Sequence, residues 1–114
     1  MYEVLAASAV TVNEHGSIEP FANNCRLYEA TGMGTALVTD WKPNLDELFA
    51  GAEVAAYRNA EECIELLRRY LHDPGARDAI ARAGQQRTLR DHTYAARMEE
   101  LVGIVEPRLR KQAA

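Results

Sequence analysis

The sequence predicts an α/β protein in which about three short parallel strands are flanked by helices and the C-terminal half is rich in helix. Residues 9–12 and 36–39 are short apolar runs with β-branched side chains, which are typical of strands. Helical patterns lie between and after these runs, and strands that alternate with helices favour a parallel sheet. Three strands are few for such a sheet, so we expect the chain to form only part of an α/β layer.

Length and composition are those of one globular domain. The chain has 114 residues, of which 47% are hydrophobic and 26% are charged, and this is enough for one modest core. Its net charge of −4 provides no general attraction for nucleic acid or an anionic membrane. Residues 1–65 carry three basic and eleven acidic side chains, whereas residues 66–114 carry ten and six. We interpret this asymmetry as two differently charged, solvated helix faces.

The sequence indicates neither a membrane span nor a metal site. It has no apolar run of about 18 residues and no export signal at its start, so we expect a cytoplasmic protein. Cys25 and Cys63 lie far apart and no histidine stands at ligand spacing, so we expect two reduced, buried thiols. No metal and no cofactor is predicted.

The N-terminal elements place polar residues where a ligand would bind. Residues 1–7 fit the end of a helix, and residues 9–12 fit the first strand. The polar segment 13–16 then lies in the loop after the carboxyl end of that strand, where open parallel sheets bind ligands. Asn13 and His15 are therefore candidate contacts, and His15 is equally well explained as a hydrogen-bonded loop residue.

A short helix followed by a buried strand forms the centre of the chain. We expect Asn23 or Asn24 to be the N-cap of this helix, with Gly32 and Gly34 ending it at positive φ. The N–H groups at such a helix start form an anion site of the kind that holds phosphates. The predicted buried face comprises Leu27, Ala30 and Met33.

Arg26 and Glu29 lie three positions apart on this helix, which makes them neighbours on its surface. One interpretation is an ion pair on a solvated face. The other is a carboxylate beside a strand edge that binds the hydroxyl pair of a ribose. The pattern alone leaves both interpretations open.

The middle of the chain is expected to form a turn, a short helix and a third strand. Pro43 begins the helix 44–49, and the strand covers residues 53–57. Trp41 lies in the turn before this helix, where a tryptophan either packs over a ligand or closes the edge of a core.

The C-terminal half is predicted to form three helices with clear start signals. Asn59 is the expected N-cap of the first, with Glu62 in the capping-box position. Asp73 caps the second, with Pro74 in its first turn, and Thr93 caps the third. The predicted buried face of the first helix comprises Cys63, Ile64, Leu66, Leu67, Tyr70 and Leu71.

The second and third helices have less regular apolar patterns. The second is expected to bury Ile80, Ala83 and Leu89 and to leave its arginines mostly outside: Arg77, Arg82, Arg87 and Arg90. We expect Pro107 to kink or end the third helix, which leaves residues 107–114 as a polar tail. The apolar residues of the third helix are expected to lie on one face, and they are Tyr94, Met98, Leu101, Val102 and Val105.

Residues 24–40 resemble the N-x-R-x-x-E-A-x-x-x-G-x-x-x-x-T-D signature of group one glycosyltransferases of the GT-B fold. Later segments are similar to further elements of that family, in the same order. These are the E-L-F and E-V elements at 47–49 and 53–54, the acid-rich helix at 61–71, R-x-x-I-A-x-x-G at 77–84 and H-T-Y-x-x-R at 92–97. The resemblance covers roughly residues 9–105.

The resemblance implies an enzyme, a hexosyltransferase-like glycosyltransferase with two Rossmann-like lobes. In that family the C-terminal lobe binds a nucleotide-diphosphate sugar donor of the UDP or GDP type. The sugar passes to an acceptor held mostly by the N-terminal lobe, without a required metal. Residues 1–114 would then be one domain, the second half of the donor-binding lobe with the N-terminal lobe absent, and inactive alone.

The resemblance also implies roles for individual residues. Glu29 matches the glutamate that holds the donor ribose, and Arg26 and Asn24 match positions near the diphosphate. The end of the same helix is matched by Thr31, Gly32 and Gly34. Many relatives carry another glutamate eight positions before the ribose one, where this chain has Phe21, with Glu19 the nearest acid.

Two other classes of function remain open at this point. The chain could be a non-catalytic nucleotide-binding or regulatory module. It could also be an interaction module that docks an acidic partner through the helices of residues 77–97, or that forms a homodimer through the exposed edge of an incomplete sheet. A dinucleotide motif at residues 32–34 is disfavoured, because it follows a helix instead of joining a strand to a helix. The residues do not specify the sugar, the base, the acceptor or the stereochemistry of transfer.

Overall fold

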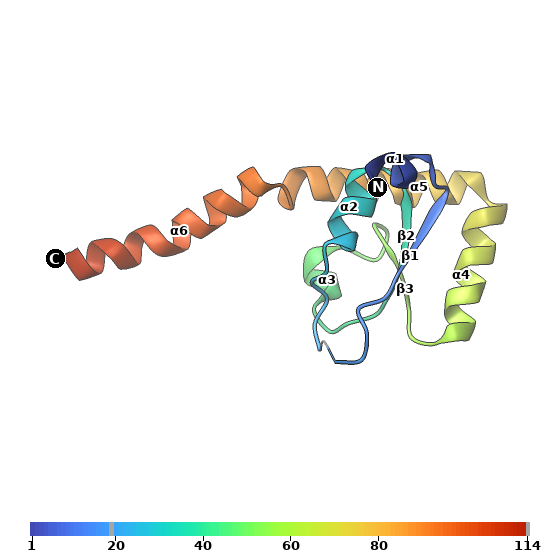
Figure 1. Ribbon diagram of the computed structural model, residues 1–114, viewed down its shortest axis with the longest axis horizontal. Coiled ribbons are helices and arrows are strands. Elements are labelled where there is room, and N and C mark those ends of the chain that lie inside the picture. The colour runs from blue at the N-terminus through green and yellow to red at the C-terminus, as the bar shows by residue number, and fades with distance from the viewer. Residues whose placement is uncertain (19, 114) are drawn as a thin grey trace.

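The structure is a computed structural model that describes residues 1–18 and 20–113, so Glu19 and Ala114 lie outside it. The described residues form helices and strands in alternation and then helices only, as predicted (Figure 1). In chain order these are α1 Tyr2–Ala7, β1 Val10–Asn13, α2 Arg26–Gly32, β2 Ala36–Asp40, α3 Leu45–Leu48, β3 Ala55–Tyr57, α4 Ala60–His72, α5 Pro74–Asp91 and α6 Tyr94–Ala113.

The strands form one parallel sheet in the order β1-β2-β3, which confirms the predicted fold class. Val10 lies opposite Ala36, and Val38 lies opposite Ala55. The central strand β2 is buried along its length up to Thr39, as its continuous apolar run predicts.

The sheet has helices on both faces, and each face has its own apolar cluster. Alternate residues of β2 point to opposite faces, so Leu37 joins one cluster and Val38 joins the other. The first cluster is closed by α1, α2 and α3, and its largest buried side chain is Phe49. The second is closed by α4 and α5 through Tyr70 and Ile80.

The helix start signals of the C-terminal half are confirmed. The side chain of Asn59 accepts a hydrogen bond from the Glu62 N–H at 2.9 Å, and Asp73 accepts one from the Ala76 N–H at 3.0 Å. Thr93 Oγ1 accepts from the Ala96 N–H at 3.1 Å. Each of these caps acts within one turn of its own chain, which is why sequence alone indicates them.

The start and the end of α2 differ from the prediction. The helix begins at Arg26 with Cys25 as N-cap and without a side-chain cap, because the amide of Asn24 is bonded elsewhere. Gly32 is the last helical residue and does not have a positive φ, whereas Gly34 does, at +79°. The single positive-φ glycine is enough to turn the chain into β2.

Several residues that were predicted to be buried are exposed. On α4, Ile64 and Leu71 lie outside the stripe that contacts the sheet, and on α5 Leu89 is 59% exposed. Ile80 is buried as predicted, and the other buried positions of α5 are Gly84 and Thr88, which follow it at steps of four residues. Cys25 is exposed at the start of α2, so only Cys63 of the two cysteines is partly covered, and burial raises its pKa.

Arg87 and the end of the last helix differ from the prediction. Arg87 is not outside: its guanidinium contacts Glu53 and the Glu47 carbonyl and ties α5 to the segment before β3. The last helix does not end at Pro107, but continues through it to Ala113.

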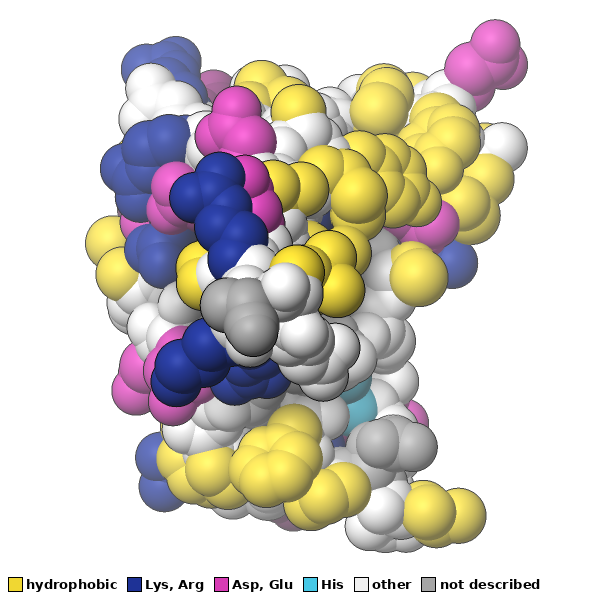
Figure 2. Space-filling model, turned by 90° about the vertical axis from the view of Figure 1, so that its left-hand side faces the viewer, with side chains coloured by type: hydrophobic (Ala, Val, Ile, Leu, Met, Phe, Trp, Pro, Cys, Tyr) yellow, Lys and Arg dark blue, Asp and Glu magenta, His cyan; other side chains and the backbone are white. Residues whose placement is uncertain are grey.

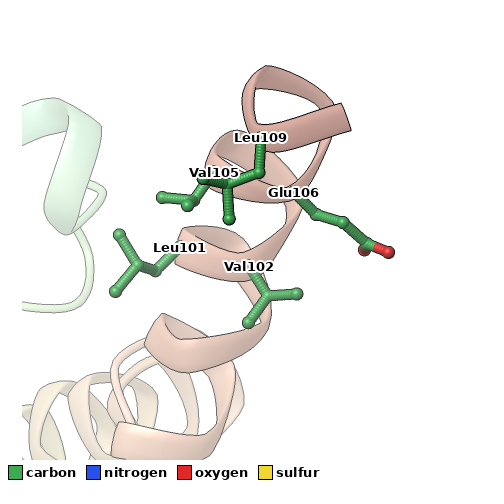
Figure 3. A pocket seen from close by; sticks show the side chains of 5 residues that line it. All are labelled: Leu101, Val102, Val105, Glu106 and Leu109. Atoms are coloured by element: carbon green, nitrogen blue, oxygen red, sulfur yellow. The ribbon is translucent and has the colours of Figure 1, made fainter. Parts of the chain in front are cut away.

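The last helix leaves the body of the protein, as Figure 1 shows. Every described residue of α6 from Met98 onward is exposed. Seen from the C-terminal end of α6, most Lys and Arg side chains lie at the left of the view, and hydrophobic side chains gather at the upper right and at the bottom (Figure 2). A shallow hollow of about 250 Å³ on α6 is lined by Leu101, Val102, Val105, Glu106 and Leu109 (Figure 3).

Candidate functional site

The carboxyl ends of the strands meet at one edge of the sheet and bring polar side chains together there. Asn13, Asp40 and Tyr57 are the last residues of β1, β2 and β3. The Tyr57 hydroxyl donates to the Asn13 carbonyl at 2.8 Å. Burial, and then the charge of Asp40, raise the pKa of Tyr57 to about 12, so this phenol stays protonated as a donor.

The loop after β1 is held against β2 by Asp40. Both carboxylate oxygens of Asp40 accept from the His15 N–H, at 3.0 and 3.1 Å, and its Oδ1 lies 2.6 Å from His15 Nδ1. Because a carboxylate is an acceptor, Nδ1 carries the proton that faces it. Lys42 Nζ lies 3.9 Å from Asp40 and donates to the Gly16 carbonyl at 2.9 Å, which ties the same loop down again.

The other ring nitrogen of His15 is buried and has no partner among the described residues. The His15 side chain is only 2% exposed, and its Nε2 has no hydrogen-bond partner among residues 1–18 and 20–113. His15 lines a hollow of about 280 Å³ together with Phe21, Asn23 and Asn24. With the Nδ1 proton directed at Asp40, the neutral tautomer of His15 would have its lone pair at Nε2, which can accept from a donor such as a hydroxyl group. A buried nitrogen without a partner is costly, so a ligand hydroxyl there would be favoured.

The structure brings Asn13, His15 and Asn24 together, and places the other predicted residues elsewhere. Arg26 and Glu29 lie on the same face of α2, with Arg26 Nε 3.8 Å from Glu29 Oε2. The Glu29 side chain retains 22% exposure, so a ligand can reach it. It does not line the hollow beside His15.

Thr31 and Gly32 lie where α2 meets α5. The Thr31 hydroxyl is bonded to the Leu27 carbonyl at 2.6 Å and lies 2.5 Å from the hydroxyl of Thr88. Gln85 donates to the Gly32 carbonyl at 3.1 Å. These contacts use both residues for packing α2 onto α5.

The tryptophan of the turn after β2 lies at the same edge of the sheet. Trp41 is 38% exposed, and the guanidinium carbon of Arg58 lies 4.5 Å from its ring centre. This cation–π contact joins the residues that follow β2 and β3. It leaves part of the indole open to solvent at the carboxyl edge.

A family model described as glycosyl transferase-like matches residues 1–103. The match covers most of the 114 residues, including the polar edge and the joint before α6. The chain belongs to the glycosyl transferase-like family. Searches of curated proteins and of solved structures each found no significant match.

Membership of the glycosyl transferase-like family confirms the resemblance that residues 24–40 carry. The family supports glycosyl transfer in general and a sugar donor as the partner. No helix of residues 1–18 and 20–113 is long and apolar enough to cross a membrane. Within the same residues, no group of His, Cys, Asp and Glu side chains converges in a way that could hold a metal ion.

Sequence reasoning missed three residues of this glycosyl transferase-like chain that shape the site. Asp40 orients His15, Thr39 contacts the Asn13 amide at 3.1 Å, and Tyr57 holds the Asn13 carbonyl. Their position in the sequence could have identified them, since each lies at or next to the carboxyl end of a predicted strand. The glutamate expected eight positions before Glu29 in relatives is Phe21 here, which lines the hollow and is exposed.

Proposed function

We propose that this chain binds a nucleotide-diphosphate sugar of the UDP or GDP type at the carboxyl edge of its sheet. The donor sugar would pass to an acceptor held by an N-terminal lobe, so the chain alone would be inactive. The observation that carries the proposal is the hollow lined by His15, whose Nε2 is buried and has no hydrogen-bond partner among the described residues, in a chain that belongs to the glycosyl transferase-like family. Catalysis requires both reactants in one cleft, and we assign no catalytic residue.

We assign the nucleotide contacts to α2. Glu29 would accept hydrogen bonds from the two ribose hydroxyls, and hydrogen bonds to a charged acceptor are stronger than those between neutral groups. Arg26, which stands beside Glu29, would neutralise part of the diphosphate charge. Its side chain is 38% exposed, which leaves it room to turn from the carboxylate to a phosphate.

We assign the contacts around the sugar to the loop after β1. His15 Nε2 would accept a hydrogen bond from a hydroxyl group, and Phe21 would offer an apolar surface to the ring. Asn24, held by Asn13, would set the wall of the hollow. Thr31 and Gly32 would act indirectly, by fixing α2 on α5.

Calorimetric titration with UDP, GDP and ADP tests the nucleotide half of the proposal. We expect saturable binding of one of them, weakened at least tenfold by Glu29→Ala and unchanged by Glu65→Ala. Glu65 is the matched control because it is an exposed glutamate on α4. If Glu29→Ala leaves the nucleotide affinity unchanged, the nucleotide site does not include Glu29. A folded chain that binds none of the three would overturn the donor proposal.

The sugar half is tested by the difference between a nucleotide and its sugar ester. We expect UDP-glucose or GDP-mannose to bind more tightly than UDP or GDP, and His15→Ala to remove only that increment. His72→Ala is the matched control, since His72 is exposed on α4. If His15→Ala weakened the nucleotide and its sugar ester equally, His15 would not face the sugar.

We also propose a second candidate, a non-catalytic module that self-associates through β1. The observation in its favour is that β1 pairs with β2 and, among the described residues, with no other strand. Its outer edge therefore offers unpaired backbone groups to another strand. Sedimentation analysis over a hundredfold concentration range tests it, and a strict monomer throughout would exclude it. The domain assignment, as the second half of a GT-B donor lobe, belongs to the first proposal.

A further inference from the structure

The last helix is attached to the rest of the protein at its first turn. From Met98 onward the described residues of α6 are exposed, and the helix projects from the body (Figure 1). Just before Met98, the charged side chain of Arg97 reaches back to the body. Arg97 therefore supplies a charged contact between α6 and the body.

Arg97 binds the imidazole of His92, the residue at which α5 ends. The Arg97 guanidinium donates to His92 Nδ1 at 2.8 Å. On the other side of the ring, His92 Nε2 donates to the Leu48 carbonyl at 2.7 Å. One imidazole thus connects α6 to the end of α3, and these two residues are the histidine and the arginine of H-T-Y-x-x-R.

The two hydrogen bonds determine the form of the ring. The guanidinium of Arg97 has no acceptor, so His92 Nδ1 must supply a lone pair. A carbonyl has no proton, so Nε2 must carry one. His92 is therefore neutral in this arrangement, and its ring packs against Tyr28 of α2 and Phe49, with centroid distances of 5.0 Å to each.

The groups that face His92 come from every element packed against it. Arg97 lies on α6, Arg87 and Asp91 lie on α5, Tyr28 lies on α2, and the Leu48 carbonyl closes α3. Burial lowers the pKa of His92 first, and the positive charges of Arg97 and Arg87 lower it further. The Leu48 carbonyl and Asp91 act in the opposite direction and do not overcome these effects.

We propose that the joint between α5 and α6 is a pH-sensitive latch in which neutral His92 holds Arg97 and protonated His92 releases it. A proton taken from solvent by Nδ1 removes the lone pair that Arg97 uses. It also places a second positive charge against that guanidinium, 2.8 Å away. The pair then separates, and α6 is free to turn about residues 92–94 while its own backbone hydrogen bonds persist.

The latch does not depend on the donor proposal, because none of its contacts uses the hollow beside His15. It does reach α2, since the ring of Tyr28, the neighbour of Glu29, packs on His92. Asp91 is not the group that titrates. Hydrogen bonds from Arg90 hold the pKa of Asp91 below its usual range, so it stays charged throughout the acid transition of a histidine.

A distance measurement by electron spin resonance tests the latch in the full chain. Spin labels are placed by Glu65→Cys on α4 and Lys111→Cys on α6, with Cys25→Ser and Cys63→Ser elsewhere. We expect one narrow distance distribution at about pH 8 and a broad one at about pH 5, which brackets the range in which histidines titrate. Between the histidine pKa values of the two states, the ratio of released to latched molecules should rise up to about tenfold per pH unit of acidification.

Two variants separate the latch from other acid effects. Glutamine can accept with its oxygen and donate with its nitrogen but cannot be protonated near neutrality, so His92→Gln should keep the narrow distribution at low pH. Arg97→Met should broaden the distribution at every pH and raise the pKa of His92, which is read independently from its imidazole NMR signals. Arg110→Met, on the exposed end of α6, is the control and should behave like the parent chain.

Three results would overturn the proposal. The first is a distribution in the parent chain that does not change between the two pH values. The second is an Arg97→Met variant whose distance distribution stays narrow, or in which the pKa of His92 does not change. This test can be read even if the His92→Gln variant does not fold. The third is a loss of helical circular dichroism in step with the broadening, since that would mean melting of α6 and not its release.

Discussion

Asn13 and Asn24 hydrogen-bond each other twice through their side-chain amides. Asn13 Nδ2 donates to Asn24 Oδ1 at 3.1 Å, and Asn24 Nδ2 donates to Asn13 Oδ1 at 3.0 Å. The first residue is the end of β1 and the second lies just before α2, so the pair closes the loop that carries His15. The second amide proton of Asn13 goes to Thr39 Oγ1 at 3.1 Å, which fastens the closed loop to β2.

Asn13→Ala should lower the free energy of unfolding by about 1–3 kcal/mol, because it removes three hydrogen bonds at a buried position. Asn13 is 7% exposed, and the groups that lose a partner belong to Asn24 and Thr39. Urea denaturation measures the change. Asn23→Ala is the matched control at an exposed position and should change stability by less than about 0.5 kcal/mol. Equal effects of the two would contradict a special role for the amide pair.

Gly84→Ala should destabilise the protein by about 1–3 kcal/mol, because an added methyl group overpacks the contact between α5 and the segment before β3. A Cβ at this position would lie 2.6 Å from the Glu53 carbonyl oxygen and 3.3 Å from Thr31 Cγ2. Thermal unfolding of Gly84→Ala is compared with that of a control variant, Gly103→Ala. At Gly103 of α6 a Cβ meets nothing within 4 Å, so Gly103→Ala should stabilise its helix by about 0.5–1 kcal/mol. Loss of stability in both variants would show that the tight approach at Gly84 is not the cause.

Arg87→Met should lower the free energy of unfolding by about 1–3 kcal/mol, since it leaves a mostly buried carboxylate without its guanidinium partner. Arg87 Nη1 lies 3.3 Å from Glu53 Oε2, and both side chains are less than 20% exposed. Arg87 Nε also lies 2.8 Å from Asp91 Oδ2, although the angle is not that of a hydrogen bond. Arg90→Met, which removes an exposed arginine bonded to Asp91, should have a smaller effect, because exposed ion pairs contribute little to stability. If chemical denaturation shows a larger loss of stability for Arg90→Met than for Arg87→Met, the ion pair between Arg87 and Glu53 does not have this stabilising role.

Deprotonation of Tyr57 should lower the free energy of unfolding at alkaline pH. Its pKa is raised to about 12 in the folded chain, so the unfolded chain, with a tyrosine pKa near 10, gives up the proton first. The stabilising contribution is complete below about pH 10 and is lost as the pH rises toward 12. Stability measured from pH 9 to 11 should therefore fall more steeply for the parent chain than for Tyr57→Phe. The same comparison with Tyr94→Phe, an exposed tyrosine, should show no difference.

The features that could be predicted from sequence are those decided within one turn or one strand. Asn59, Asp73 and Thr93 cap helices by bonding a backbone N–H three residues later, so neighbours in sequence are enough. The start of α2 could not be predicted in this way. The amide of Asn24 had a better partner eleven residues upstream, and that partner is visible only once β1 and α2 lie side by side.

The errors on the helix faces have a similar cause. A periodic pattern shows that a helix has an apolar face, but not which part of that face the sheet covers. On α5 the buried position is Thr88 and not Leu89, because a hydroxyl at 88 meets Thr31 of α2. Pro107 was expected to kink or end α6. The helix does not end there, since proline removes only one hydrogen bond of the ladder and the remaining turns continue past it.

The candidate site could be predicted as a place more easily than as a set of contacts. Asn13 and His15 follow a strand, and the carboxyl edge of a parallel sheet is where ligands gather. The tie between His15 and Asp40 spans 25 residues and requires the parallel register of β1 and β2. The nucleotide roles of Glu29 and Arg26 stay predictions, since their ion pair is compatible with either interpretation of α2.

The projecting last helix also determines how the molecule rotates in solution. The principal extents are 61 × 28 × 24 Å, so one axis is more than twice as long as either of the others. Rotation about that axis is faster than end-over-end rotation, and a nitrogen-15 relaxation experiment would distinguish amide bonds by their angle to it. The N–H bonds of α6 run nearly along the helix, so they would report the slow rotation. Their relaxation would match that of a heavier particle than a chain of 12.7 kDa.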